Sequence, residues 1–234
     1  MSSNERYNYF SMFTPEGKVL PIESVIRSTE HGGVCVALRN KTSGLIIAQK
    51  MGKQDKFTEG KSKVKQLDEY LVYTYSGITN DGVQFGERLK RKLQKEKHRT
   101  GTVLSIAQLV EEQQFHNGLE VMRYGNRAPG VSVIILGVEK SELVLMEMTP
   151  TGETIPSFGC CIGARAQSAR TILDSQGDRI LGMSDSELLE LGMSAFRNAI
   201  NNPEVLSGEH YDIVQVSLST GVCFQSPSSS SPSG

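Results

Sequence analysis

The stretch VCVALRNKTSGLIIA, residues 34–48, decides the fold class. It contains two apolar runs, Val34–Leu38 and Gly44–Ala48, on either side of a polar turn at Asn40–Ser43. Short runs rich in Val and Ile that are bounded by turn residues are typical of strands. We therefore expect two neighbouring strands here, and the rest of the chain is interpreted outward from them.

The apolar pattern changes its period farther along the chain. Residues 83–93 and 103–110 carry apolar side chains at helical spacing, whereas residues 131–136 and 143–148 return to the apolar runs of strands. Arranged in chain order, the predicted elements are a helix at Pro21–His31, strands at Val34–Leu38, Gly44–Ala48, Lys63–Leu67 and Leu71–Tyr75, helices at Asn80–Arg99 and Thr102–Met122, strands at Val131–Leu136 and Leu143–Met148, helices at Arg165–Leu173 and Glu187–Ala199, and a strand at Tyr211–Leu218.

Strands and helices come in blocks along the chain rather than in regular βαβα alternation. This order predicts an α+β fold in which two antiparallel sheets pack together, with a helix pair on each outer face. Residues 15–224 contain no internal linker and are interpreted as one domain. Residues 1–14 form an N-terminal arm, and residues 225–234 form a Ser/Pro tail that is too polar to fold.

The composition excludes several classes of protein. The 234 residues include 25 Lys and Arg and 26 Asp and Glu, and the resulting net charge of −1 argues against a protein that coats nucleic acid or membranes. No apolar run reaches the ~18 residues of a membrane span. A chain of this length needs no disulfide framework, so we expect a reducing compartment. The four Cys and four His form no metal motif and the glycines form no phosphate loop, so we expect no metal and no cofactor.

The strongest local charge is the run RLKRKLQKEKHR at Arg88–Arg99, in which seven of twelve residues are Lys or Arg. Such a run can bind nucleic acid, and an RNA-binding protein would show an affinity that falls steeply with salt. It can also be a solvated helix face or a contact with an acidic neighbour. Because no aromatic residues are interleaved with the cations, we favour this second interpretation and expect no direct nucleic-acid partner.

Four motifs follow one another over most of the chain. They are FTPEGK at Phe13–Lys18, GITND at Gly77–Asp81, YGNRAPGV at Tyr124–Val131 and GARAQSARTIL at Gly163–Leu173. In this order they resemble the alpha-type subunits of the 20S proteasome. The fourth motif is most similar to that of the alpha subunits at ring position six.

The resemblance implies the N-terminal-nucleophile hydrolase fold, a four-layer α/β/β/α sandwich. It also implies a structural and gating function in a heteroheptameric outer ring, which stacks on a beta ring and serves ATP- and ubiquitin-dependent protein degradation in cytoplasm and nucleus. The expected partners are other alpha subunits, beta-ring subunits and regulatory caps, with no membrane partner. The two long helices, at 80–99 and 102–122, would then supply contacts between the rings.

No residue of the chain suits the catalysis of this fold. The active beta subunits of the family use an N-terminal Thr at the head of the first strand. Here that strand begins with Gly33, Val34 and Cys35, without a hydroxyl group, and the only Gly-Thr bond, Gly101-Thr102, precedes a helix. We therefore expect a non-catalytic subunit. The alternative is an active amidohydrolase of the same fold with an unrecognised nucleophile.

The resemblance also implies two binding features. In the family, a Lys anchors the C-terminal carboxylate of an activator tail in a pocket between neighbouring alpha subunits, and the matching residue is Lys63, with Lys61 as the second choice. Gly32 and Ile78 match the other wall of that pocket. The residues that match the gate and its turn are Tyr7, Asn8, Phe13, Pro15, Gly17 and Glu23. In this cluster Asn8 replaces an acid of the family and Ser24 replaces a phenol.

Overall fold

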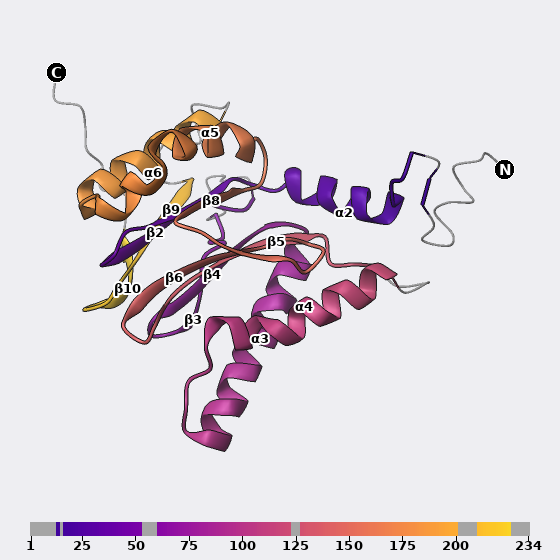
Figure 1. The fold of residues 1–234 in the computed structure, drawn as a ribbon, viewed down its shortest axis with the longest axis horizontal. Helices are drawn as coiled ribbons and strands as arrows, with labels where there is room; N and C mark the ends of the chain where they lie inside the picture. Colours follow the sequence, from indigo (N-terminus) through magenta and orange to yellow (C-terminus); the bar gives the residue numbers. More distant parts are fainter. Residues whose placement is uncertain (1–12, 15, 53–59, 123–126, 201–209, 226–234) are drawn as a thin grey trace.

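The computed structural model describes residues 13–14, 16–52, 60–122, 127–200 and 210–225 (Figure 1). The helices in this part of the chain are α2 (Leu20–Glu30), α3 (Thr79–Thr100), α4 (Ile106–Met122), α5 (Ala166–Gln176) and α6 (Asp185–Ala199), with a 3-10 helix, η1, at Gly177–Gly182. The strands are β1 (Cys35–Arg39), β2 (Ser43–Gln49), β3 (Lys65–Asp68), β4 (Leu71–Gly77), β5 (Val131–Glu139), β6 (Glu142–Met148), β7 (Thr154–Pro156), β8 (Gly159–Ile162), β9 (Tyr211–Ser217) and β10 (Gly221–Gln225).

The strands form two five-stranded sheets in which all named pairings are antiparallel. The order in the first sheet is β10-β9-β2-β1-β8, and the order in the second is β3-β4-β5-β6-β7. The hairpin that residues 34–48 predict is β1–β2, in which Val36 pairs with Ile47.

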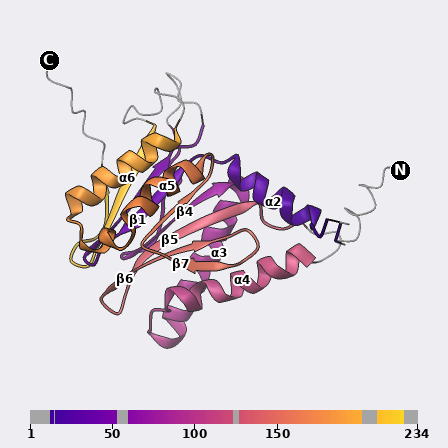
Figure 2. The ribbon, with the colours of Figure 1, turned by 45° about the horizontal axis from the view of Figure 1, so that its top comes forward.

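The two sheets pack face to face, and each carries a pair of helices on its outer face (Figures 1 and 2). Helices α5 and α6 cover the first sheet, and α3 and α4 cover the second. This arrangement confirms the predicted α+β sandwich with its four layers. Helix α2 lies at one end of the sandwich, against β4 and β5.

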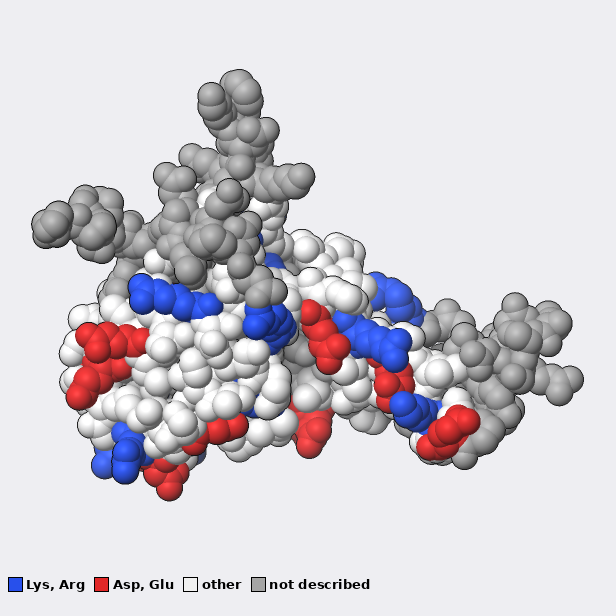
Figure 3. Space-filling model, turned by 90° about the horizontal axis from the view of Figure 1, so that it is seen from above, with Lys and Arg blue, Asp and Glu red and all other residues white. Residues whose placement is uncertain are grey.

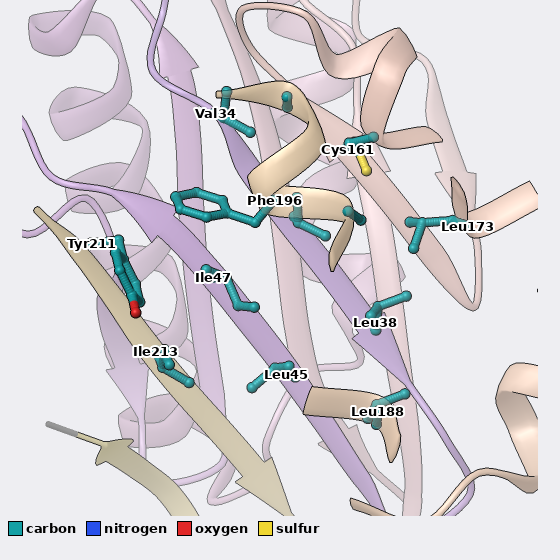
Figure 4. Packing of buried hydrophobic residues seen from close by; sticks show 14 of the residues in the cluster. Val34, Leu38, Leu45, Ile47, Cys161, Leu173, Leu188, Phe196, Tyr211 and Ile213 are labelled. Atoms are coloured by element: carbon teal, nitrogen blue, oxygen red, sulfur yellow. The ribbon is translucent and has the colours of Figure 1, made fainter. Parts of the chain in front are cut away.

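The side chains of β1 and β2 alternate between two apolar cores. Ala37 and Ile46 point into the core between the sheets. Leu38 and Ile47 point into the core beneath α5 and α6, which also contains Phe196 of α6 (Figure 4). Because both faces of these strands are buried, their sequences are continuously apolar instead of alternating with polar residues.

Helix α3 lies very close to the second sheet. A Cβ atom at Gly82 would overlap the ring of Tyr75, and one at Gly86 would overlap the hydroxyl end of Tyr73. Both tyrosines are buried, with exposed fractions of 0% and 3% respectively. The glycines of α3 are therefore required by packing, although glycine is a poor helix former.

Several predicted boundaries are wrong, and four elements (β7, β8, β10 and η1) are absent from the prediction. Helix α4 begins at Ile106 rather than at Thr102, because the hydroxyl of Ser105 accepts a hydrogen bond from the Gln108 amide and a Glu139 carboxylate oxygen accepts one from the Ile106 amide. Strand β10 ends at Gln225, which the prediction assigns to the tail. Residues 1–12 of the predicted arm and 226–234 of the tail lie outside the described residues.

Candidate functional site

Lys63 is a buried cation in the segment that leads into β3. Its exposed fraction is 5%, and it lies two residues before the strand rather than at its first position. A Cβ atom on Gly33 would lie 2.8 Å from the Lys63 Nζ atom, so the ammonium group reaches the backbone just before β1. Among the described residues, this ammonium group forms no ion pair with a carboxylate. A lysine with so little solvent exposure is stabilised by an acceptor at its ammonium group, so this position is suited to binding an anion.

The backbone of Gly32 packs directly against the end of β4. A Cβ atom there would overlap the hydroxyl of Ser76 and the backbone nitrogen of Gly77. The Gly32 carbonyl oxygen also accepts a hydrogen bond from the Ala164 amide, with an N···O distance of 2.8 Å. This close backbone contact places Gly32 next to the segment that continues into Ile78.

Ile78 is half solvent-exposed at the start of α3, with an exposed fraction of 39%. Its amide donates to the Gly130 carbonyl oxygen at 2.8 Å, and a Cβ atom on Gly130 would lie 2.8 Å from the Ile78 Cδ1 atom. The structure thus brings Lys63, Gly32 and Ile78 into one region. Lys61, in contrast, is exposed and exchanges backbone hydrogen bonds with Met51.

An ion pair that the sequence analysis does not predict supports the Ile78 wall. The Asp81 carboxylate accepts hydrogen bonds from Arg127 Nη1 at 2.6 Å and Arg127 Nη2 at 2.8 Å, and from the Gly130 amide at 2.9 Å. Burial alone would raise the pKa of Asp81, but the hydrogen bonds from Arg127 and Gly130 outweigh burial and lower this pKa below its ordinary value. The pair joins two of the quoted motifs, GITND and YGNRAPGV, and fixes Gly130 against Ile78.

The predicted gate residues are only partly described. Tyr7, Asn8 and Pro15 lie outside the described residues. Phe13 is 70% exposed, and Gly17, with a φ angle of 77°, donates a backbone hydrogen bond to Thr14. Glu23 lies in the first turn of α2, where a carboxylate favours the positive end of the helix.

The cysteine thiols of β1 and β8 are not activated as nucleophiles. The Cys35 thiol is completely buried and lies 3.4 Å from the Thr74 hydroxyl, and burial raises its pKa. Burial also raises the pKa of Cys161 to about 12 and that of Cys160 well above its usual value. These thiols therefore remain protonated at neutral pH, and a thiol is a much weaker nucleophile than a thiolate.

The described residues contain no cluster of three His, Cys, Asp or Glu side chains that could hold a metal ion. A search of the same residues finds no helix with the length and apolar character needed to cross a bilayer.

Comparisons with known proteins agree on one family. The family model described as "Proteasome subunit" matches residues 29–216. The chain is 24% identical over 213 residues to proteasome subunit alpha type-1 of Caenorhabditis elegans, covering 91% of this chain and 82% of that protein. It is 26% identical to proteasome subunit alpha type-6 of Saccharomyces cerevisiae, covering 89% of each chain. It is 22% identical to the probable alpha type-6 subunit of Schizosaccharomyces pombe, covering 86% of this chain and 74% of that protein.

Proposed function

Because the chain belongs to the proteasome subunit family, we propose that it is a non-catalytic alpha subunit in the outer ring of a 20S core particle. Its partners would be other alpha subunits, beta-ring subunits and regulatory caps. The particle would carry out ATP- and ubiquitin-dependent protein degradation in the cytoplasm and nucleus. The named relatives are alpha subunits, and the buried, protonated thiols near β1 support a chain without its own catalytic nucleophile.

The observation that carries the proposal furthest is Lys63, which is 5% exposed and forms no ion pair within the described part of the chain. A C-terminal carboxylate of an activator would form a charge-assisted hydrogen bond with it, and such bonds are the strong ones in proteins. Gly32 lets the backbone pack directly against Ser76 and Gly77, which fixes the segment that leads to Ile78. Ile78 offers an exposed apolar surface beside it for the tail that carries the carboxylate.

The test is a comparison of Lys63→Met with Lys61→Met in the assembled particle. Methionine keeps most of the volume of lysine but removes the charge, and Lys61 is the exposed control two residues away. We expect Lys63→Met to weaken binding of an activator C-terminal peptide by roughly 10–100-fold, the equivalent of one hydrogen bond to a charged group. Lys61→Met should leave the affinity unchanged.

The peptide amide supplies a second control, because it lacks the negative charge. If Lys63 binds the carboxylate, amidation should weaken binding to the parent particle and have little further effect on Lys63→Met. Fluorescence anisotropy with labelled peptides measures all four combinations. Equal affinity of the parent and Lys63→Met particles for the free-acid peptide would reject Lys63 as the anchor.

Gating is proposed for the arm that ends at Phe13. The exposed aromatic ring of Phe13 is available to pack against neighbouring arms of the ring. Deletion of residues 2–12 should raise the rate of peptide hydrolysis by the whole particle, and an unchanged rate would mean that the arm is not part of the seal. Labelling of this chain by an electrophilic probe for N-terminal Thr would contradict the non-catalytic assignment.

A further inference from the structure

Three hydroxyl side chains in the sequence lie three residues after an arginine. A protein kinase with an acidic substrate cleft selects a substrate by such a cation before the hydroxyl, and an apolar side chain directly after the hydroxyl adds to the recognition. The three hydroxyl residues are Thr42, Thr102 and Ser168, which follow Arg39, Arg99 and Arg165 respectively. The sequence does not rank these three matches, but the structure does.

Thr42 lies in the tight turn between β1 and β2. Its amide and its hydroxyl both donate to the side-chain oxygen of Asn40, at 2.8 and 3.2 Å. The cation is also engaged, because the Arg39 guanidinium lies 4.8 Å from the centre of the Phe158 ring. The next residue, Ser43, is polar and only 1% exposed. A kinase could bind this site only if the hairpin opened.

Ser168 lies in the first turn of α5. Its carbonyl oxygen accepts a hydrogen bond from the side-chain amide of Asn198 in α6, at 2.9 Å. Ala169, which follows it, is completely buried in the core beneath α5 and α6. Binding of this site in an extended conformation would therefore unwind a helix from the core.

Thr102 lies outside regular structure. Helix α3 is followed by Gly101, whose φ angle of 71° turns the chain away from the helix axis, and residues 102–105 form neither helix nor strand. Thr102 is exposed, and Val103 directly after it is 64% exposed. This end of α3 also projects away from the two sheets (Figure 1). The segment thus presents a hydroxyl and an apolar side chain that a kinase can reach in the folded chain.

The contacts that hold Thr102 are local. Its hydroxyl lies 2.7 Å from that of Thr100, and its amide donates to the Thr100 hydroxyl at 3.3 Å. Neither bond reaches the core, and segments held by a few exposed hydrogen bonds open at a small cost in free energy. Thr100 is less suited to reaction, because it is the last residue of α3 and its hydroxyl donates to the Glu96 carbonyl oxygen at 2.9 Å.

The end of α3 supplies the cations that precede this hydroxyl. Residues 95–99 contain three Lys or Arg and a single acid, Glu96. Arg99 contacts the Glu96 carboxylate at 2.6 Å, but its side chain is 67% exposed, and such surface pairs are easily exchanged for another partner. On the face that α5 and α6 cover, in contrast, basic and acidic side chains are interspersed (Figure 3).

We propose that Thr102 is a phosphorylation site for a protein kinase that recognises basic residues, with Arg99 and Val103 as the residues that select it. In this step the Thr102 hydroxyl oxygen forms a bond to the γ-phosphorus of ATP, the bond from that phosphorus to the β–γ bridging oxygen breaks, and ADP leaves. The hydroxyl proton passes to a base of the kinase. The proposal does not depend on ring assembly, because every residue that carries it belongs to this chain.

The phosphate would change the charge at this end of α3. It adds about −1.5 to −2 charges at pH 7 and three strong acceptor oxygens. Arg99 and Lys97 are the nearby cations that can form charge-assisted hydrogen bonds with it. The modified residue lies at the opposite end of α3 from Ile78, so the region around Lys63 would be unaffected.

Phosphorylation of the purified, folded chain tests the choice among the three matches. After incubation with cyclic-AMP-dependent protein kinase and MgATP, mass spectrometry should locate phosphate on Thr102 and none on Thr42 or Ser168. Thr102→Ala should abolish this incorporation, whereas Thr102→Ser and Thr100→Ala should retain it. A folded chain without phosphate on Thr102, or one modified on Thr42 or Ser168 in its place, would overturn the proposal.

Two exposed arginines test the recognition. Arg99→Gln should lower kcat/KM for phosphate transfer to the chain by roughly 10–100-fold, the equivalent of one hydrogen bond to a charged group. The control Arg165→Gln makes the same change in net charge three residues before Ser168, and it should leave kcat/KM unchanged. Equal values for these two variants would exclude Arg99 as the selecting residue.

The native protein supplies the last test. In the chain isolated from its own cells in the presence of phosphatase inhibitors, the same mass spectrometry should find phosphate on Thr102, and treatment with a phosphatase should remove it. Absence of this phosphate from the native chain would overturn Thr102 as a modification site.

Discussion

Replacement of Asp81 by alanine should destabilise the chain more than the loss of its partner Arg127 does. The Asp81 side chain is 8% exposed and that of Arg127 is 60% exposed. Truncation of Asp81 leaves the buried Gly130 amide without its acceptor, whereas truncation of Arg127 leaves that hydrogen bond intact. The two variants therefore separate the buried hydrogen bond from the solvent-exposed ion pair.

The expected magnitudes follow from these contacts. An unsatisfied buried donor costs about 1–3 kcal/mol, and a largely exposed ion pair contributes up to about 1 kcal/mol. Asp81→Ala should therefore lower the free energy of unfolding by about 1–4 kcal/mol, and Arg127→Ala by at most about 1 kcal/mol. For a domain of this size, a loss of about 1–4 kcal/mol corresponds to a fall of roughly 2–16 °C in Tm.

Urea denaturation of the purified chain, followed by circular dichroism, measures both variants. The pH dependence supplies a second check, because the folded-state pKa of Asp81 is lowered. Its contribution to stability is complete above the unfolded pKa of about 3.9 and is lost as the pH falls through the folded pKa. The difference in stability between the parent and Asp81→Asn should shrink over that acidic range. Equal losses for Asp81→Ala and Arg127→Ala at pH 7 would refute the reasoning.

Two further variants test the packing and the electrostatics of the sandwich. Gly86→Ala should destabilise the chain by about 1–3 kcal/mol in urea denaturation, because the new Cβ atom overlaps buried Tyr73. The control is Gly118→Ala in α4, where the new Cβ atom would meet nothing within 4 Å. This variant should stabilise the chain by up to about 1 kcal/mol. A change in unfolding free energy of the same sign in both variants would contradict the packing argument. Burial raises the pKa of Glu147, although the Arg170 guanidinium lies 3.2 Å from its carboxylate. The protonated form of Glu147 therefore stabilises the fold. This stabilisation is complete below the unfolded pKa of about 4.3 and is lost as the pH rises through the folded pKa. In thermal melts Glu147→Gln should unfold at a higher temperature than the parent at pH 7 and lose that advantage below about pH 4, whereas a difference that does not change with pH would exclude ionisation as its cause.

The elements that the sequence predicts well are those with a strong local signal. The hairpin in residues 34–48 is apolar on both faces because it lies between two cores, and α3 carries buried apolar side chains at helical spacing from Phe85 to Leu93. Strand β8 escapes prediction because it has only four residues, Gly159–Ile162, and begins with a glycine. This segment is a strand because it pairs with β1, where Cys161 lies opposite Val36. A contact between segments so distant in sequence leaves no local pattern.

The candidate site shows the same limit. The six lysines of residues 50–65 are alike in sequence, and only the tertiary structure distinguishes Lys63, which is buried, from the exposed Lys61. Asp81 and Arg127 lie 46 residues apart, so no spacing rule connects them, although both belong to motifs quoted for the family resemblance. The sequence alone does not show the contact between these two motifs. Through this contact, Asp81 and Arg127 hold Gly130 against Ile78.

Positioning and binding can be separated at this site, because they depend on different residues. In the proposed tail pocket Lys63 supplies the charge. It forms no ion pair among the described residues, so Lys63→Met should weaken tail binding without lowering the stability of the chain. Asp81 is not one of the residues that match the pocket, yet it holds Gly130, whose carbonyl oxygen binds the Ile78 amide. Asp81→Ala should therefore lower both stability and tail affinity, and its effect on affinity should persist with the peptide amide, because the displaced wall is apolar. An Asp81→Ala effect that disappears with the amide would instead place the Asp81–Arg127 pair in the recognition of the carboxylate.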